Sequence, residues 1–130
     1  MINSTNTATQ TVNVNAPVLF ANDPIKTGCT VRHEQGSGRF VITKPGIYRV
    51  TVGGVLSAPA ATTAILNLYQ DGEQVQSAQI QATVSTTDIE TTYLTKLVKV
   101  YCNGSVISLV NNSTAAVTLA NANMIIDRLC

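Results

Sequence analysis

A strand, a tight turn and a second strand follow one another between Gly38 and Val52. Phe40 and Ile42 share one face of the first strand, and Pro45-Gly46 ends it. Proline presets φ for a turn and glycine accepts a positive φ, so this dipeptide interrupts a strand without strain. The second strand alternates with period 2, with Tyr48, Val50 and Val52 on one face and Ile47, Arg49 and Thr51 on the other. We expect Phe40, Tyr48, Val50 and Val52 to lie in the protein core.

The composition fits a β protein with uncharged polar surfaces. Hydrophobic residues make up 45% of the 130 residues, and charged residues only 12%, against about 25% in average globular domains. The net charge is +1 and no basic run occurs, which argues against nucleic acid or an anionic membrane as a partner. No apolar run approaches the ~18 residues of a membrane span. The first residues lack the basic and apolar regions of a secretory signal.

Turn signals divide the chain into about nine or ten short strands, which is typical of a sandwich or jelly roll. Asp71-Gly72 is the strongest hairpin signal, because a type I′ turn needs positive φ at both central residues. Asn103-Gly104 predicts a second hairpin. Residues 1–10 consist mainly of Asn, Thr, Ser, Ala and Gln. We expect these ten residues to be a flexible N-terminal arm, and residues 11–130 to form a single domain.

Several predicted strands are apolar on both faces. Ile107 and Leu109 alternate with Val106 and Val110, and Met124 and Ile126 alternate with Ile125. One face can fill the core, but the other needs separate cover, and a contiguous exposed apolar patch usually marks an interface. Self-association would provide that cover. Alternatively, these strands lie at sheet centres and are capped by loops.

The spacing of Gly38, Phe40, Pro45-Gly46 and Tyr48 resembles the jelly-roll family of the complement one-q globular head and tumour necrosis factor. Further pieces from Leu66 to Gly72, from Val100 to Val110 and from Met124 to Leu129 are similar in order and spacing. The resemblance implies an all-β, ten-stranded, two-sheet jelly-roll sandwich that assembles as a homotrimer. It implies a subunit interface on the inner sheets that includes Ile47, Arg49, Thr51, Ile107, Leu109 and Ile125.

Arg49 is the one charged residue in this predicted interface. A buried arginine requires a partner, because an unpaired buried charge is costly. Asp127 in the closing strand is a candidate, from the same or a neighbouring subunit. The alternative is an arginine that lies along a solvated sheet face.

No constellation of residues indicates an enzyme or a cofactor. The acidic residues are scattered, and Cys29 and His33 form only a remote nucleophile pair. No metal-ligand spacing occurs in the sequence. Three aspartates in loops could nevertheless reach a calcium site: Asp23, Asp71 and Asp88. Three widely spaced cysteines, Cys29, Cys102 and Cys130, form no disulfide framework. We expect them to be reduced; the alternatives are a single bridge or an intermolecular bond through Cys130.

We therefore expect a non-enzymatic homotrimeric structural or attachment module of a phage particle, located in the virion as a fibre, decoration or receptor-binding head. Residues 1–10 would bind other virion or surface proteins, and the head could bind a host-surface receptor or glycan. The alternatives are the terminal domain of a bacterial-cell or spore-surface filament, and a lectin-like carbohydrate-binding domain. The scarcity of aromatic residues disfavours the lectin.

Overall fold

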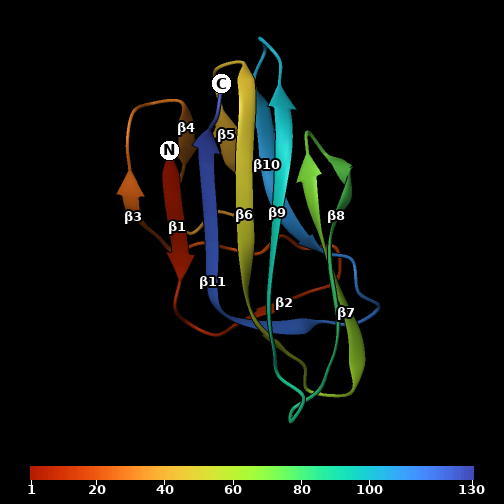
Figure 1. The fold of residues 1–130 in the computed structure, drawn as a ribbon. Coiled ribbons are helices and arrows are strands. Elements are labelled where there is room, and N and C mark those ends of the chain that lie inside the picture. Colours follow the sequence, from red (N-terminus) through yellow and green to blue (C-terminus); the bar gives the residue numbers. More distant parts are fainter.

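The computed structural model describes residues 1–130 as two antiparallel sheets packed face to face (Figure 1). The sheet in front in Figure 1 has the strand order β3-β1-β11-β6-β9 and the second has the order β4-β5-β10-β7-β8. The first sheet contains β3 (Asn22–Lys26), β1 (Ile2–Asn6), β11 (Val117–Arg128), β6 (Gly46–Ser57) and β9 (Glu90–Val100), and β2 (Gln10–Val12) pairs with the start of β11. The second contains β4 (Val31–His33), β5 (Phe40–Ile42), β10 (Ser105–Asn111), β7 (Thr62–Gln70) and β8 (Glu73–Val84).

The core lies between the two sheets and contains 27 buried hydrophobic residues. Phe40, Tyr48, Val50 and Val52 are all fully buried in it. Tyr48 also makes a polar contact at the edge of the core, where its hydroxyl donates a hydrogen bond of 2.8 Å to the Lys44 carbonyl oxygen. This bond ties the core to the turn between β5 and β6.

The hairpin turns form where the sequence predicts them. Asp71 and Gly72 both have positive φ, 54° and 81°, and they connect β7 to β8 as a two-residue loop. Gly104 has a φ of 79° in the loop between β9 and β10. The Asp71 carboxylate accepts hydrogen bonds from the Val106 amide and the Ser105 hydroxyl, so it fastens the first hairpin to β10.

The predicted flexible arm over residues 1–10 is wrong, because most of it is built into the first sheet. β1 pairs with β11 on one side and with β3 on the other, and β2 pairs with β11. Ile2 and Ser4 are fully buried. Alternation explains the outcome: Ile2 and Ser4 face the core, while the polar Asn3 and Thr5 face outward.

The predicted interface positions Ile107 and Leu109 are wrong, because both side chains are fully buried in the core. β10 lies between β5 and β7, with Ile107 opposite Phe40 and Leu109 opposite Leu68. Directly opposed residues point to the same face of a sheet, so these two residues join Phe40 and Leu68 in the core. The outward face of β10 carries Val106, Ser108 and Val110 instead.

All three cysteines, Cys29, Cys102 and Cys130, are free and exposed. The chain contains no helix with the length and apolar character needed to cross a membrane.

Candidate subunit interface

The outward face of the first sheet, hereafter the assembly face, collects side chains from β6, β9, β11 and β1. Strand register places them in rows: Asn3 lies opposite Ile125, Ile125 opposite Thr51, and Thr51 opposite Thr95. In the next row Asp127 lies opposite Arg49, and Arg49 opposite Leu97. Because Tyr48, Val50 and Val52 fill the core, period 2 sends Ile47, Arg49 and Thr51 to this face.

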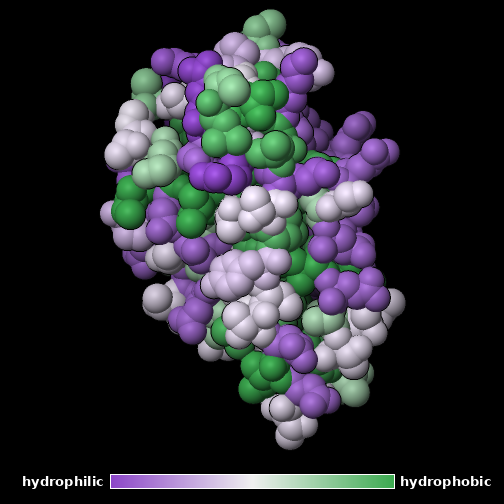
Figure 2. Space-filling view, viewed as in Figure 1, coloured by the Kyte–Doolittle hydropathy of each residue, from purple (hydrophilic) through white to green (hydrophobic).

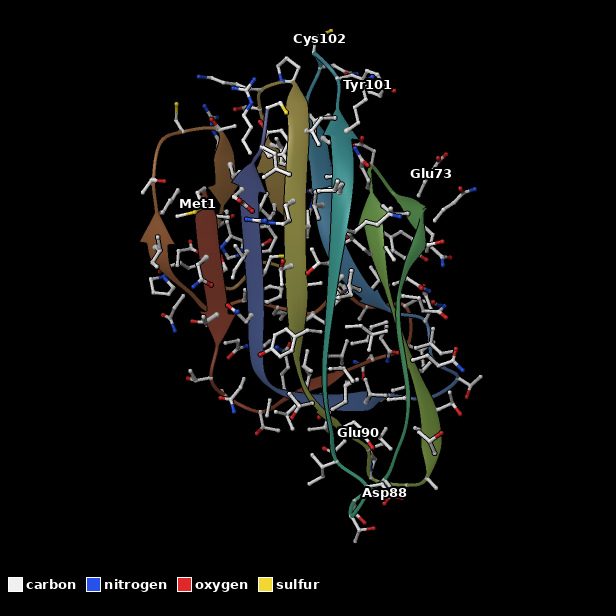
Figure 3. All side chains as sticks on the ribbon, viewed as in Figure 1. Met1, Glu73, Asp88, Glu90, Tyr101 and Cys102 are labelled. Atoms are coloured by element: carbon white, nitrogen blue, oxygen red, sulfur yellow. The ribbon has the colours of Figure 1, made fainter.

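Large apolar side chains are exposed on the assembly face. Tyr93 is 54% exposed and Leu97 56% exposed, and both project from the outward side of β9. Tyr101 and Leu129 are also exposed, beyond the ends of β9 and β11. Figure 2 shows this side as mixed green and white areas with a green cluster near the upper ends of these strands. Figure 3 places Tyr101 and Cys102 at the same upper end, and Asp88 and Glu90 at the lower end.

The outward face of the second sheet is polar on β8, which exposes Gln74, Gln76, Gln79, Gln81 and Thr83 on that side. The same face is partly apolar at Val41, Val106 and Val110 of β5 and β10. The first sheet differs in carrying the exposed aromatic and aliphatic side chains of β9, Tyr93 and Leu97.

The assembly face carries one ion pair formed within a single chain. The Arg49 guanidinium donates to both oxygens of the Asp127 carboxylate, from Nη2 at 2.8 Å and from Nε at 3.3 Å. The Arg49 side chain is 50% exposed. Asp127, the partner that the sequence suggested, thus lies on the adjacent strand of the same protomer. A bidentate pair of this kind fixes both side chains flat against the sheet.

Two carbonyl oxygens on the assembly face have no hydrogen-bond donor. They are Oδ1 of Asn3 and Oδ1 of Asn123, and both are buried. A buried acceptor without a partner costs about 1–3 kcal/mol. These amides lie on β1 and β11, next to the row that contains Ile125 and Thr51.

The assembly face contains four of the six predicted interface residues: Ile47, Arg49, Thr51 and Ile125. It does not contain Ile107 or Leu109. Sequence reasoning missed Tyr93 and Leu97, which are more exposed than Ile47, Thr51 or Ile125. The signal was present, because Tyr93, Thr95 and Leu97 alternate along one strand with Leu94 and Val98 on its other face.

A buried polar cluster at the open edge of the sandwich joins residues far apart in the sequence: Ser4 of β1, Asp23 of β3 and His33 of β4. His33 Nδ1 lies 2.7 Å from Asp23 Oδ1, and His33 Nε2 lies 2.7 Å from the Ser37 carbonyl oxygen. The Ser4 hydroxyl donates to the same Asp23 oxygen. Sequence reasoning did not predict this cluster, because its members come from three strands.

The cluster contains serine, histidine and aspartate, but its geometry is not that of a catalytic triad. A triad histidine uses one ring nitrogen for the nucleophile and the other for the carboxylate. Here Nε2 is occupied by a backbone carbonyl, and the Ser4 hydroxyl lies 3.5 Å from Nδ1, on the same side as Asp23. Cys29, the other nucleophile considered for His33, is exposed, whereas both His33 ring nitrogens have other partners.

The acidic residues do not converge on a metal site. No group of three or more His, Cys, Asp or Glu side chains is placed to hold a metal ion. Two of the three candidate calcium ligands already have hydrogen-bond partners: Asp23 in the buried cluster and Asp71 at β10.

No protein-family model matches the sequence, and no curated protein matches it. Solved structures do match the fold. Murine APRIL aligns with a TM-score of 0.73 and 11% identity over 98% of each chain. The globular domain of zebrafish complement 1qA protein aligns with a TM-score of 0.63 and 10% identity, over 95% of this chain and 94% of that one.

Vertex protein P5 of the phage PRD1 aligns with a TM-score of 0.64 and 12% identity, over 99% of this chain and 96% of that one. The chain therefore has the complement one-q and tumour necrosis factor-like jelly-roll fold, which is typically non-enzymatic. At these identities the likeness concerns the fold.

Proposed function

We propose that this chain is a non-enzymatic homotrimeric structural or attachment module of a phage particle. The observation that carries the proposal is the assembly face. A sheet with a complete core on one side still exposes Tyr93 and Leu97 on the other side, beside Ile47 and Ile125. A second and a third copy of the chain would cover these side chains, and burial of apolar surface would stabilise the assembly.

The other polar groups of the assembly face are compatible with burial between subunits. Arg49 and Asp127 form a neutral pair within each protomer, so burial of this pair would leave neither charge without a partner. The Thr51 and Thr95 hydroxyls are hydrogen-bonded to each other at 3.1 Å. The trimeric state itself is taken from the family that the chain resembles, whose members assemble around a threefold axis.

The phage location rests on the likeness to vertex protein P5 of PRD1 over nearly the whole of both chains. A vertex protein occupies a position on a particle, and a trimeric jelly roll suits a fibre, a decoration or a receptor-binding head there. Residues 1–10 belong to the sheet, so attachment to other particle proteins would use another surface. The terminal domain of a bacterial or spore surface filament is the second candidate, taken from the family that the chain resembles.

The oligomeric state tests the core of the proposal. Light scattering of the purified protein at micromolar concentration should give three times the 13.7 kDa mass of one chain. Leu97→Glu should reduce the mass to that of one chain, because it places a charge in an apolar contact. Gln81→Glu is the matched control, because it adds the same charge to the exposed polar face of β8. A monomeric wild-type protein, or a Leu97→Glu protein that remains a trimer, would overturn the assignment.

Arg49 provides a second test of the same face. Arg49→Glu places two carboxylates side by side with Asp127 and should prevent assembly by repulsion. The double variant Arg49→Glu, Asp127→Arg restores a pair of opposite charges across the same two strands. Recovery of the trimer by the double variant is the expected result. A fully trimeric Arg49→Glu protein would show that these two residues lie outside the interface.

The location is tested separately from the assembly. Antibodies raised against the purified domain should label phage particles in electron micrographs of lysates from the source. Labelling confined to cell or spore surfaces would favour the filament. Binding of the trimer to one glycan class on an array would instead support the lectin-like alternative.

A further inference from the structure

We infer that the Ser4–Asp23–His33 cluster is a polar clip, in which His33 is a buried imidazolium cation that joins the edges of the two sheets. Asp23 and Ser4 belong to β3 and β1 at one edge of the first sheet. His33 belongs to β4 at the edge of the second sheet. The contact of 2.7 Å between His33 Nδ1 and Asp23 Oδ1 therefore crosses between the sheets.

The hydrogen-bond partners determine the protonation of the ring. A carbonyl oxygen only accepts, so the 2.7 Å contact with the Ser37 carbonyl oxygen requires a hydrogen on Nε2. An ionised carboxylate also only accepts, so the contact with Asp23 requires a hydrogen on Nδ1. In water an imidazole is a stronger base than a carboxylate by more than about two pKa units. The proton between the two groups therefore belongs to the ring, and both ring nitrogens carry hydrogen.

Burial makes the pair sensitive to the loss of either charge. The His33 side chain is 0% exposed and that of Asp23 is 7% exposed. Phe40 stacks on the imidazole with ring centroids 4.2 Å apart, and Phe20 meets it edge-on. Without the proton, the lone pair of Nδ1 would face the Asp23 carboxylate at hydrogen-bond distance. Removal of one partner of a buried pair is much more costly than the net contribution of the intact pair.

The other charged groups near His33 lie at the surface. Lys26 of β3, Arg32 and Glu34 on either side of His33, and Arg39 before β5 line the same groove of about 630 Å³. β1 contributes Ser4 and no ionisable side chain, and the amino terminus donates to the Thr27 carbonyl oxygen. β5 contributes the uncharged Phe40. Among the charged groups only Asp23 contacts the ring, so the Asp23 carboxylate alone balances the charge of the imidazolium.

Nuclear magnetic resonance can test the inference directly, because His33 is the only histidine in the chain. With nitrogen-15 in the ring, the folded wild-type protein at pH 7 should show both ring nitrogens protonated. A ring with a single protonated nitrogen at pH 7 would overturn the inference. This measurement needs no variant, so it decides the question even if substitutions impair folding.

Two variants and hydrogen exchange test the function of the clip. Asp23→Asn should give a ring with a single protonated nitrogen at pH 7, because it removes the carboxylate that the second ring hydrogen contacts. Glu34→Gln, which removes a neighbouring exposed carboxylate, is the matched control and should behave as the wild type. At the same pH, amides of β3 and β1 should exchange faster in Asp23→Asn than in the wild type, and exchange in β7 should change less. Equal acceleration in all three strands would show that the pair does not hold the edge.

Discussion

Replacement of Tyr48 should be among the most destabilising single changes in this chain. Tyr48 is fully buried, and its ring lies in the core between the sheets. Truncation of a large buried aromatic side chain to alanine costs about 3–5 kcal/mol, because transfer energy is lost and a cavity remains. Its hydrogen bond to the Lys44 carbonyl contributes about 1 kcal/mol of this.

The assay is thermal unfolding by circular dichroism at one fixed protein concentration, since self-association raises the apparent melting temperature. For a chain of this size, 1 kcal/mol corresponds to roughly 3–5 °C. Tyr48→Ala should therefore lower the melting temperature by roughly 10–25 °C. Tyr48→Phe, which keeps the ring, should lower it by roughly 2–6 °C.

Tyr101→Ala is the matched control for Tyr48→Ala. Tyr101 is 63% exposed and its ring contacts Lys99, whose Nζ lies 5.2 Å from the ring centroid. The control should melt near the wild-type temperature. A Tyr48→Ala protein that melts within about 5 °C of the wild type would refute the reasoning, because a side chain buried on all sides cannot be removed at so small a cost.

Burial raises the pKa of the Tyr48 hydroxyl, and the positive charge of Arg128 opposes that rise, so stability should fall as the pH rises above about 10, the unfolded value. In phenolate absorbance one of the four tyrosines should then ionise after the others, and Tyr48→Phe should remove that step. Gly53→Ala should cost about 1–3 kcal/mol, since its Cβ would lie 2.1 Å from the Thr92 carbonyl oxygen and 2.6 Å from the Tyr93 ring; an unchanged denaturation midpoint would contradict this. EDTA and calcium should leave the melting temperature unchanged. A fall of more than a few degrees on addition of EDTA would instead indicate that the loops bind calcium.

The sequence predicted local structure correctly in the regions where a single pattern, such as alternation or a turn signal, dominates. The strand from Gly46 to Ser57 alternates clearly, and its buried face contains Tyr48, Val50 and Val52 as expected. Asp71-Gly72 predicted its hairpin because few residue pairs accept positive φ at both positions. Both signals depend on a few adjacent residues, so a single sequence suffices to detect them.

The errors occurred where the deciding contacts are non-local. In β10 both faces are apolar, and alternation alone cannot tell which face meets the core; the pairing with β5 and β7 decides it. In β1 only Ile2 is a large apolar residue, so the segment looked like a tail, and its place in the sheet depends on β11 and β3. The His33 cluster joins three strands and has no local signature.

The ion pair on the assembly face has a consequence for how such a face can be buried. If Arg49 relied on a neighbouring subunit for its carboxylate, each free protomer would carry an unpaired arginine on this face, and three arginines would approach one another near a threefold axis. The structure pairs Arg49 with Asp127 on the adjacent strand of the same chain, before any association. Each protomer then presents a neutral unit whose hydrogen bonds are already formed. Association has to remove water from that unit but does not have to create the pair, so the apolar side chains beside it can provide the driving force.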